Sequence, residues 1–206
     1  MVIWFLLDSG EELIMYGRRK KLPEILNNLE ASKLLSIPNP RYPTGLRNLA
    51  MMAVMLNIGL RVSEVTNLKP GHINLTENKL RVVNGKGGVD RDLTIPNGYT
   101  TELLKKWKDR RPKGEYFFCT LKDGQVSTRY IGLAVKRYIL KAGINKNISP
   151  HSLRHSFATE FYRQTKDLET LRMILGHSSI LTSQIYITLA CEEVKAAMNG
   201  FNQFVR

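Results

Sequence analysis

Apolar residues recur every three or four positions along most of the chain, a spacing that places them on one face of a helix. Between the proline-rich break at 38–43 and Gly59 they predict a buried helix through Leu46, Leu49, Met52, Ala53 and Leu56. The same period predicts one helix that starts at Leu22 and runs through Leu34. It predicts others over residues 62–68, around 103–107, and over 128–142, 152–163, 168–175, 182–189 and 192–204.

Two short segments, Leu80–Val83 and Asp92–Ile95, have the composition of strands. The glycine-rich stretch Asn84–Gly88 between them is typical of a hairpin turn. A third segment, Tyr116–Phe118, predicts a brief extended stretch. The whole pattern therefore indicates an α+β fold that is mainly α-helical with a small antiparallel β-sheet.

The length of 206 residues suits one main domain with a single core. The chain opens on an apolar run, but Asp8 ends it far short of the roughly 20 residues that span a bilayer. No membrane anchor or secretory signal is expected. We expect residues 1–21 to be an N-terminal remnant or linker, and residues 22–206 to form the domain.

Basic residues outnumber acidic ones, with 31 Lys and Arg against 18 Asp and Glu, and the net charge of +13 is spread along the chain. This balance favours a polyanionic partner, although a merely basic soluble enzyme would share it. Cys119 and Cys191 form no CxxC pair, so neither a disulfide framework nor a zinc ribbon is indicated, and a reducing cytoplasm fits.

Candidate chemistry gathers in a short C-terminal span. His151 and Arg154 follow Pro150 three residues apart, so on a helix they share a face and can converge on one phosphate. His155 comes directly after Arg154 and should turn away from it, which favours a core hydrogen bond. His151 and His155 also have the spacing of a zinc pair, but Ser152 replaces the glutamate of the H-E-x-x-H pattern.

Two further polar residues allow more than one interpretation. His177 follows Gly176 at a predicted helix end, where its imidazole can donate to a phosphate oxygen or simply cap the helix. Tyr186 can serve as a nucleophile, but most tyrosines between apolar neighbours are core residues with a hydrogen-bonded tip. Neither residue indicates a function by itself.

Taken in order, four blocks of this sequence resemble the tyrosine recombinases of the phage-integrase and Xer type. The blocks are GLRVSE at 59–64, GKGG at 85–88, PHSLRHSFAT at 150–159, and LGHSS at 175–179 leading to Tyr186. The resemblance covers most of the chain beyond the N-terminal segment. It implies the catalytic-domain fold of that family, and site-specific cleavage and rejoining of DNA through a covalent 3′-phosphotyrosyl intermediate, without ATP, metal or cofactor.

The resemblance also implies a role for each matched residue. Two arginines and two histidines would clamp the scissile phosphate, a lysine would protonate the departing 5′ oxygen, and a tyrosine would attack: Arg61, Arg154, His151, His177, Lys86 and Tyr186. Glu64 and His155 would play supporting parts. Preorganised donors of this kind offset the negative charge that grows on the phosphate in the transition state.

The expected partner is double-stranded DNA. Arg129, Lys136 and Arg137, on the predicted helix 128–142, are candidate phosphate contacts, although a solvated basic face accounts for them equally well. A C-terminal helix, about residues 191–206, would dock onto a neighbouring copy or cover its own domain. We expect a monomer when free, a homo-tetramer on DNA, and a cytoplasmic location on the nucleoid or in the host of a mobile element.

Two other functions stay open at this point. A type IB topoisomerase shares the chemistry but relaxes supercoils without exchanging strands, and a DNA-binding regulator would keep the fold without cleavage. The GKGG turn and the H-x-L-R-H block favour the recombinase. The complete set of matched residues argues against the regulator.

Overall fold

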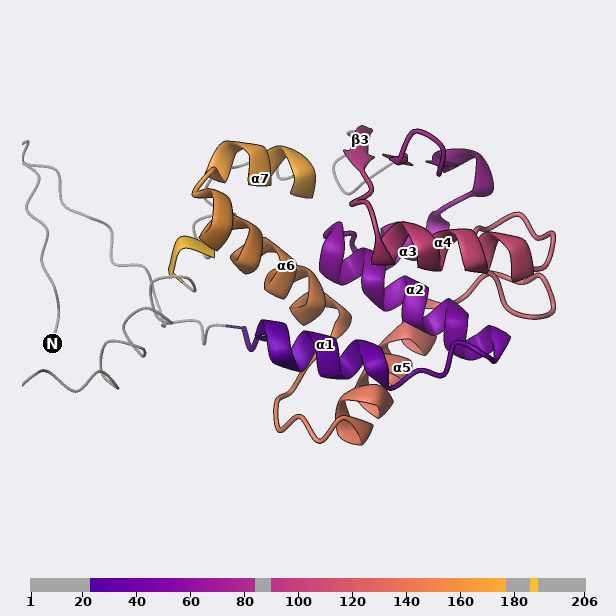
Figure 1. Ribbon diagram of the computed structural model, residues 1–206, viewed down its shortest axis with the longest axis horizontal. Coiled ribbons are helices and arrows are strands. Elements are labelled where there is room, and N and C mark those ends of the chain that lie inside the picture. The colour runs from indigo at the N-terminus through magenta and orange to yellow at the C-terminus, as the bar shows by residue number, and fades with distance from the viewer. Residues whose placement is uncertain (1–22, 84–89, 177–185, 189–206) are drawn as a thin grey trace, which may run out of the picture.

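The computed structural model of the chain describes residues 23–83, 90–176 and 186–188 (Figure 1). These ranges contain mostly helices and one small sheet, and residues 186–188 form a further helical turn. The helices are α1 (Asn28–Ser36), α2 (Pro43–Asn57), α3 (Val62–Asn67), the 3-10 helix η1 (Pro70–His72), α4 (Tyr99–Arg110), α5 (Thr128–Lys141), α6 (Pro150–Thr165) and α7 (Leu168–Leu175). The strands are β1 (Ile73–Asn74), β2 (Lys79–Val82) and β3 (Arg91–Thr94). The predicted α+β class is confirmed.

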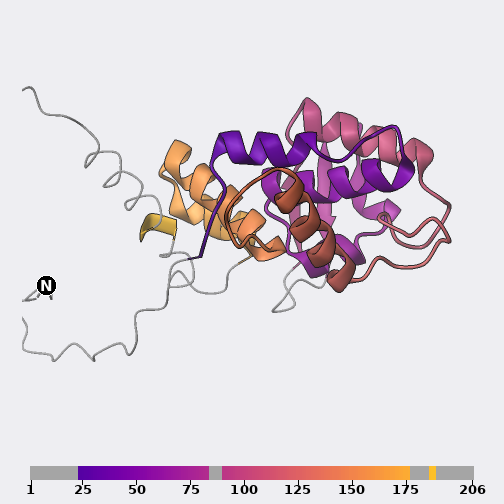
Figure 2. The ribbon, with the colours of Figure 1, turned by 90° about the horizontal axis from the view of Figure 1, so that it is seen from below.

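Helix α2 is the centre of the domain. Every residue from Gly45 to Leu56 is buried, because α1, α3, α4, α5 and α6 all pack against this helix (Figures 1 and 2). Pro43 occupies its first turn, where the missing backbone N–H costs nothing. A helix that is apolar almost all round is stable only in such a position, so the predicted burial is confirmed.

The sheet has the order β1-β2-β3, and both pairs are antiparallel. Leu80 of β2 lies opposite Leu93 of β3, and both side chains are buried. The predicted strands match β2 and β3, while the two-residue β1 is too short to leave a periodic signal. Residues 116–118 form bends instead of the predicted extended segment.

Helix α1 begins later than predicted. The apolar pattern suggested a start at Leu22, but residues 23–27 are not helical. Asn27 and Glu30 form a capping box: the Asn27 side chain accepts the Glu30 N–H at 2.8 Å, and the Glu30 carboxylate accepts the Asn27 N–H at 2.9 Å. The helix therefore starts at Asn28, and the predicted start was wrong.

Helix α6 joins two apolar clusters. Ser149 caps it by accepting the Ser152 N–H at 3.3 Å, and Leu153 in its first half belongs to the main core around α2. Its second half contributes Ala158 to a smaller cluster with Leu171, Leu175 and Tyr186. Arg154 lies in sequence between Leu153 and Ala158, where α6 passes from one cluster to the other.

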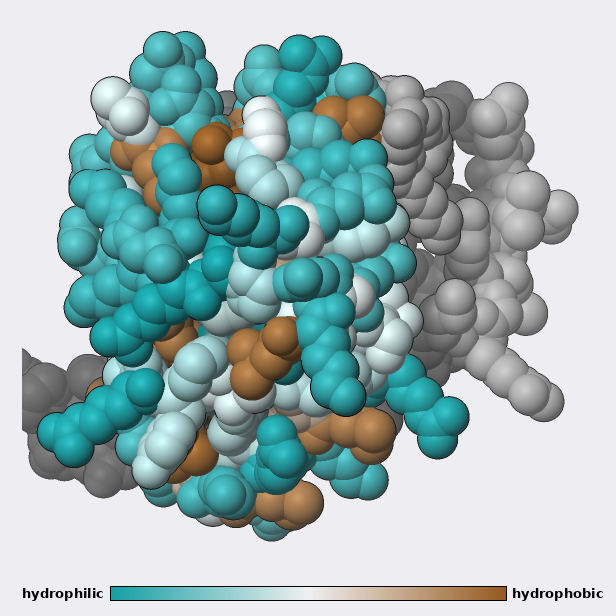
Figure 3. All heavy atoms as spheres, turned by 90° about the vertical axis from the view of Figure 1, so that its right-hand side faces the viewer, coloured by the Kyte–Doolittle hydropathy of each residue, from teal (hydrophilic) through white to brown (hydrophobic). Residues whose placement is uncertain are grey.

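Figure 3 shows one face of the molecule, the one that carries the C-terminal end of α4 and the loop 111–127. This face is largely hydrophilic, with scattered apolar residues. No helix in the described part of the chain is long and apolar enough to cross a membrane. Of the predicted helix 182–189, only residues 186–188 are described, and they are helical. The segment 1–21 and the predicted C-terminal helix lie outside the described residues, so both stay predictions.

Candidate active site

Arg154 is a buried guanidinium with its partners in place. The residue is only 5 % exposed, and an arginine is rarely buried unless its charge has a partner. Nη1 donates to the Gly59 carbonyl at 2.6 Å, and Nη2 donates to the Leu175 carbonyl at 2.6 Å. Burial, and then the charge of Arg61, lowers the pKa of Arg154 to about 10. Arg154 therefore stays charged at neutral pH.

Arg61 precedes the first turn of α3 and is tied to Glu64. Its backbone N–H donates to Glu64 Oε2 at 2.8 Å, and its Nη1 donates to Oε1 at 3.0 Å. Gly59 supplies the turn into this segment with a φ of +75°, and a Cβ there would lie 2.4 Å from the ring of Phe157. A residue other than glycine would therefore displace the segment that carries Arg61.

Arg91, the first residue of β3, is a member of the cluster that the sequence analysis missed. Its Nη1 and Nη2 donate to the two oxygens of Glu64 at 2.9 and 3.0 Å. The available signal was the strand alternation, since Arg91 shares the inward face of β3 with Leu93. Burial opposes ionisation of Glu64, but the contacts of Arg91, followed by those of Arg61 and Arg154, together outweigh it and hold the pKa of this carboxyl below its usual value.

The three arginines also hold the end of α7. Arg91 Nε donates to the Ile174 carbonyl at 2.7 Å, Arg154 Nη2 to Leu175, and Arg61 Nη2 to Gly176 at 3.3 Å. The last carbonyls of a helix lack backbone partners and carry partial negative charge. Three positive groups on three successive carbonyls therefore fix this helix end beside Glu64.

Tyr186 packs against α6 and the end of α7. Its side chain is 1 % exposed and lies in the apolar cluster with Leu171 and Leu175. Its ring centroid is 5.6 Å from that of His155. Burial raises the pKa of the Tyr186 phenol, against the opposing charges of Arg154 and Arg61. The phenol is therefore close enough to feel both arginines, and it is protonated at neutral pH.

The two described histidines of α6 differ in their surroundings. His151, in the first turn, is exposed. His155 is half-buried, and its Nδ1 is buried without a hydrogen-bond partner among the described residues. The core hydrogen bond predicted for His155 is therefore not made at Nδ1. Burial, followed by the charges of His151 and Arg154, lowers the pKa of His155 to about 4, so its ring is neutral at pH 7.

The remaining candidates are not part of this cluster as described. Lys86 and His177 lie outside the described residues. Arg129, Lys136 and Arg137 are exposed on α5, as a DNA contact or a solvated face would require. Within residues 23–83, 90–176 and 186–188, no group of three or more His, Cys, Asp and Glu is placed to hold a metal ion.

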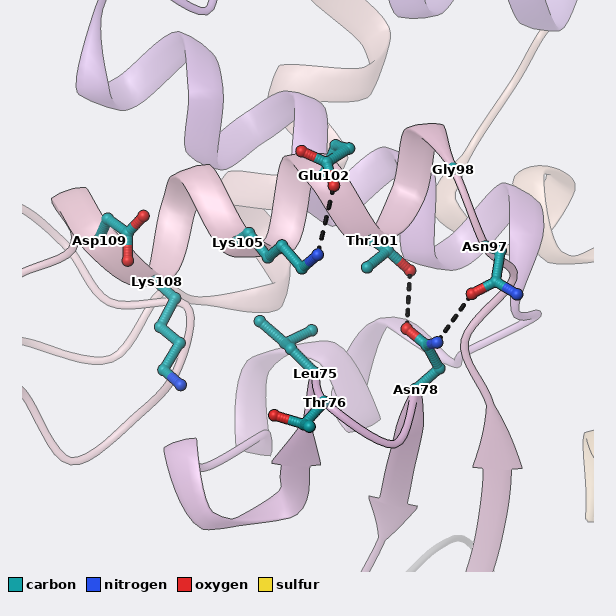
Figure 4. Close-up of a pocket in the computed structure, with 10 residues that line it drawn as sticks. All are labelled: Leu75, Thr76, Asn78, Asn97, Gly98, Thr101, Glu102, Lys105, Lys108 and Asp109. Atoms are coloured by element: carbon teal, nitrogen blue, oxygen red, sulfur yellow. Dashed lines mark hydrogen bonds and ion pairs between the residues drawn. The ribbon is translucent and has the colours of Figure 1, made fainter.

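A pocket of about 720 Å³ lies elsewhere, between α4 and the turn that joins β1 to β2 (Figure 4). Asn78 and Asn97 meet at its edge in a side-chain hydrogen bond of 2.7 Å, and Thr101 donates to Asn78 at 3.3 Å. None of the predicted site residues lines this pocket. The arginine cluster, and not this pocket, is the candidate active site.

Comparison with known proteins assigns this arrangement to a family. The model of the phage integrase family matches residues 24–193. The chain belongs to the phage integrase family. Curated relatives of this integrase-family chain include tyrosine recombinase XerD of Ralstonia nicotianae, which is 34 % identical over 183 residues that cover 85 % of the chain and 59 % of the relative. Tyrosine recombinase XerA of Thermococcus kodakarensis is 34 % identical over 193 residues, covering 92 % and 67 %.

Solved structures agree with the family assignment. The crystal structure of XerA recombinase has a TM-score of 0.75 and 29 % identity, and the match covers 91 % of this integrase-family chain and 68 % of that chain. XerH recombinase bound to a palindromic difH substrate, in a post-cleavage complex, has a TM-score of 0.74 and 30 % identity, covering 87 % and 54 %. The chain spans 59 % to 67 % of the length of the two curated relatives named above.

Proposed function

We propose that this chain is the catalytic domain of a site-specific DNA recombinase that cleaves and rejoins strands through a 3′-phosphotyrosyl intermediate. The observation that carries the proposal is the convergence of Arg61 and Arg154 on Glu64 and the end of α7, with Tyr186 within reach of their charge. The relatives named tyrosine recombinases support strand exchange over relaxation by a topoisomerase.

In the proposed reaction, Arg61 and Arg154 bind the non-bridging oxygens of the scissile phosphate. Their positive charges offset the negative charge that grows as phosphorus becomes pentavalent. The Tyr186 oxygen forms a bond to phosphorus, and the bond from phosphorus to the 5′ oxygen breaks. The phenol proton passes to His151, and Lys86 gives a proton to the leaving 5′ oxygen.

Rejoining is the reverse of cleavage. The 5′ hydroxyl of the same or another strand attacks the phosphotyrosine, and the tyrosine leaves with its proton restored. The energy of the broken phosphodiester is kept in the covalent bond to Tyr186, so no ATP is needed. His177 would donate a hydrogen bond to the phosphate as the fourth member of the clamp.

The burial of Tyr186 adds a requirement to this scheme. Its side chain is 1 % exposed, so the hydroxyl must become accessible before it can reach a phosphate in DNA. Burial also raises the pKa of the phenol, so a base has to remove its proton during attack. We therefore propose that DNA binding is accompanied by movement of the 186–188 turn.

The proposed partner is double-stranded DNA, and the proposed location is the cytoplasm. The net charge of +13 and the exposed Arg129, Lys136 and Arg137 support phosphate contacts that weaken as salt rises. The palindromic substrate of XerH supports symmetric copies on one site. We propose a monomer when free and a homo-tetramer on DNA, for which the amphipathic sequence near 191–206 would supply the contact between copies.

The decisive experiment traps the covalent intermediate. Wild type and Tyr186→Phe are incubated in EDTA with a pool of nicked, end-labelled duplexes and separated on a denaturing gel. Tyr162→Phe is the matched control, because Tyr162 packs against the same apolar cluster as Tyr186. We expect an adduct with the wild type and the control, and none with Tyr186→Phe. An adduct of equal yield with Tyr186→Phe would show that another residue attacks.

A further inference from the structure

Arg91 pairs with Glu64 through both of its terminal nitrogens, whereas Arg61 uses one terminal nitrogen and its backbone N–H. Both of its terminal nitrogens lie within 3.0 Å of the carboxylate oxygens, whereas Arg154 Nη1 is 3.7 Å from Oε2. Such a fork-to-fork pair is the strongest geometry for a guanidinium and a carboxylate. The Arg91 side chain is 8 % exposed, so solvent screens the pair only weakly. Arg91 is therefore the principal counter-charge of Glu64.

The charges of the cluster depend on this pairing. Arg61, Arg91 and Arg154 carry three positive charges, Glu64 carries one negative charge, and the sum is +2. Without Arg91 the sum falls to +1, and the buried carboxylate has only Arg61 and Arg154 to neutralise it. A buried carboxylate that lacks a partner draws the nearest cations toward itself.

We infer that Arg91 is a positioning residue that neutralises Glu64 and so leaves the charges of Arg61 and Arg154 available to a phosphate. This inference rests on the proposed function of the site. Arg91 also anchors α7 through the Ile174 carbonyl, a role that needs only hydrogen bonds and no neutralisation of Glu64. The two roles are separable, since a second substitution can remove the carboxylate charge without restoring the anchor.

The first arm measures single-turnover adduct formation on the nicked duplex. Arg91→Gln should slow it by about 10- to 100-fold, because the carboxylate then competes with phosphate for both remaining arginines. The double variant Arg91→Gln, Glu64→Gln should form the adduct at least about tenfold faster than Arg91→Gln alone. Arg91→Lys keeps the charge but not the fork, so it should lose less than Arg91→Gln and remains informative if that variant does not fold.

Arg111→Gln is the matched control. Arg111 is another partly buried arginine that donates to three carbonyls, those of Gly114, Tyr116 and Phe117. It directly follows α4, whose C-terminal end lies away from α7 (Figure 1), and these three contacts involve no carboxylate. This variant should cleave like the wild type once its folded fraction is equalised. Failure of Glu64→Gln to rescue Arg91→Gln would overturn the inference and leave Arg91 as an anchor of α7.

The second arm does not need cleavage. The thermal midpoint is measured with inorganic phosphate and with chloride at equal ionic strength, since a ligand that binds the folded state raises it. Phosphate should raise the midpoint of the wild type and of the double variant more than that of Arg91→Gln. Equal shifts in wild type and Arg91→Gln, or no shift in the wild type, would overturn the inference. If the wild type forms no adduct, the proposed function fails while this arm still decides the role of Arg91.

Discussion

The half-buried ring of His155 makes the stability of the domain depend on pH. Its pKa lies at about 4 in the folded chain, against 6.5 for an unperturbed histidine. The unfolded chain therefore binds more protons between these two values, and stability rises with pH across that window. The contribution is fully present above pH 6.5 and is lost as the pH falls toward 4.

The magnitude follows from the two pKa values. For a fully buried ring, the difference between pKa values of 6.5 and about 4 would correspond to about 3 kcal/mol of unfolding free energy. His155 is only half-buried, and solvent screening reduces this to about 1–2 kcal/mol. His151 and Arg154 on α6 act on this ring with like charge, and Tyr186 packs beside it, so none of these three neighbours supplies a carboxylate that would offset protonation.

The assay is urea unfolding at about pH 7.5 and about pH 5, on either side of the ordinary titration of histidine. The test variant is His155→Phe, which keeps a ring against Tyr186 and removes both the titration and the unpaired Nδ1. We expect this variant to lose about 1 kcal/mol or more of the pH dependence, and the exposed His151→Gln to keep most of it. An unchanged pH dependence in His155→Phe would refute the reasoning.

Three further predictions concern the arginine cluster and its surroundings. Gly59→Ala should lower the unfolding free energy by about 2 kcal/mol or more, because the φ of +75° is strained for alanine and the new Cβ meets Phe157 at 2.4 Å. In the same urea unfolding assay, Gly132→Ala, a helical position with open space around it, should be neutral or stabilising. Arg154→Lys should reduce adduct formation by about 100-fold or more in the trapping assay while DNA binding is retained. Lys86→Ala should be rescued by a 5′-phosphorothiolate substrate, whose leaving group needs no proton, and absence of rescue would remove Lys86 from the acid role.

Several features of this chain follow from local sequence. The apolar period over 43–57 predicts a buried helix because almost no face of it can be solvated without cost. Ser149 and Pro150 mark the start of α6 through the missing backbone partners of a helix N-terminus. The four recombinase blocks identify the family because chemistry at a phosphodiester needs particular side chains at particular spacings. Each helix signal, and each block taken singly, depends on residues a few positions apart.

Other features were decided by contacts between distant segments. Ile25 and Leu26 extend the apolar pattern of α1, yet Leu26 is held outside the helix by a hydrogen bond from its N–H to Ser156, 130 residues away. Arg91 lies between two acidic neighbours in a short strand, and nothing local places it on Glu64. Within the described part of the chain, His155 Nδ1 is buried without a hydrogen-bond partner while its ring packs beside that of Tyr186, which the local sequence did not indicate. Local period and residue type were enough to predict most of the helices and the family. Only the tertiary structure decided how the charges pair, because electrostatic and hydrogen-bond energies depend on distances that the fold creates.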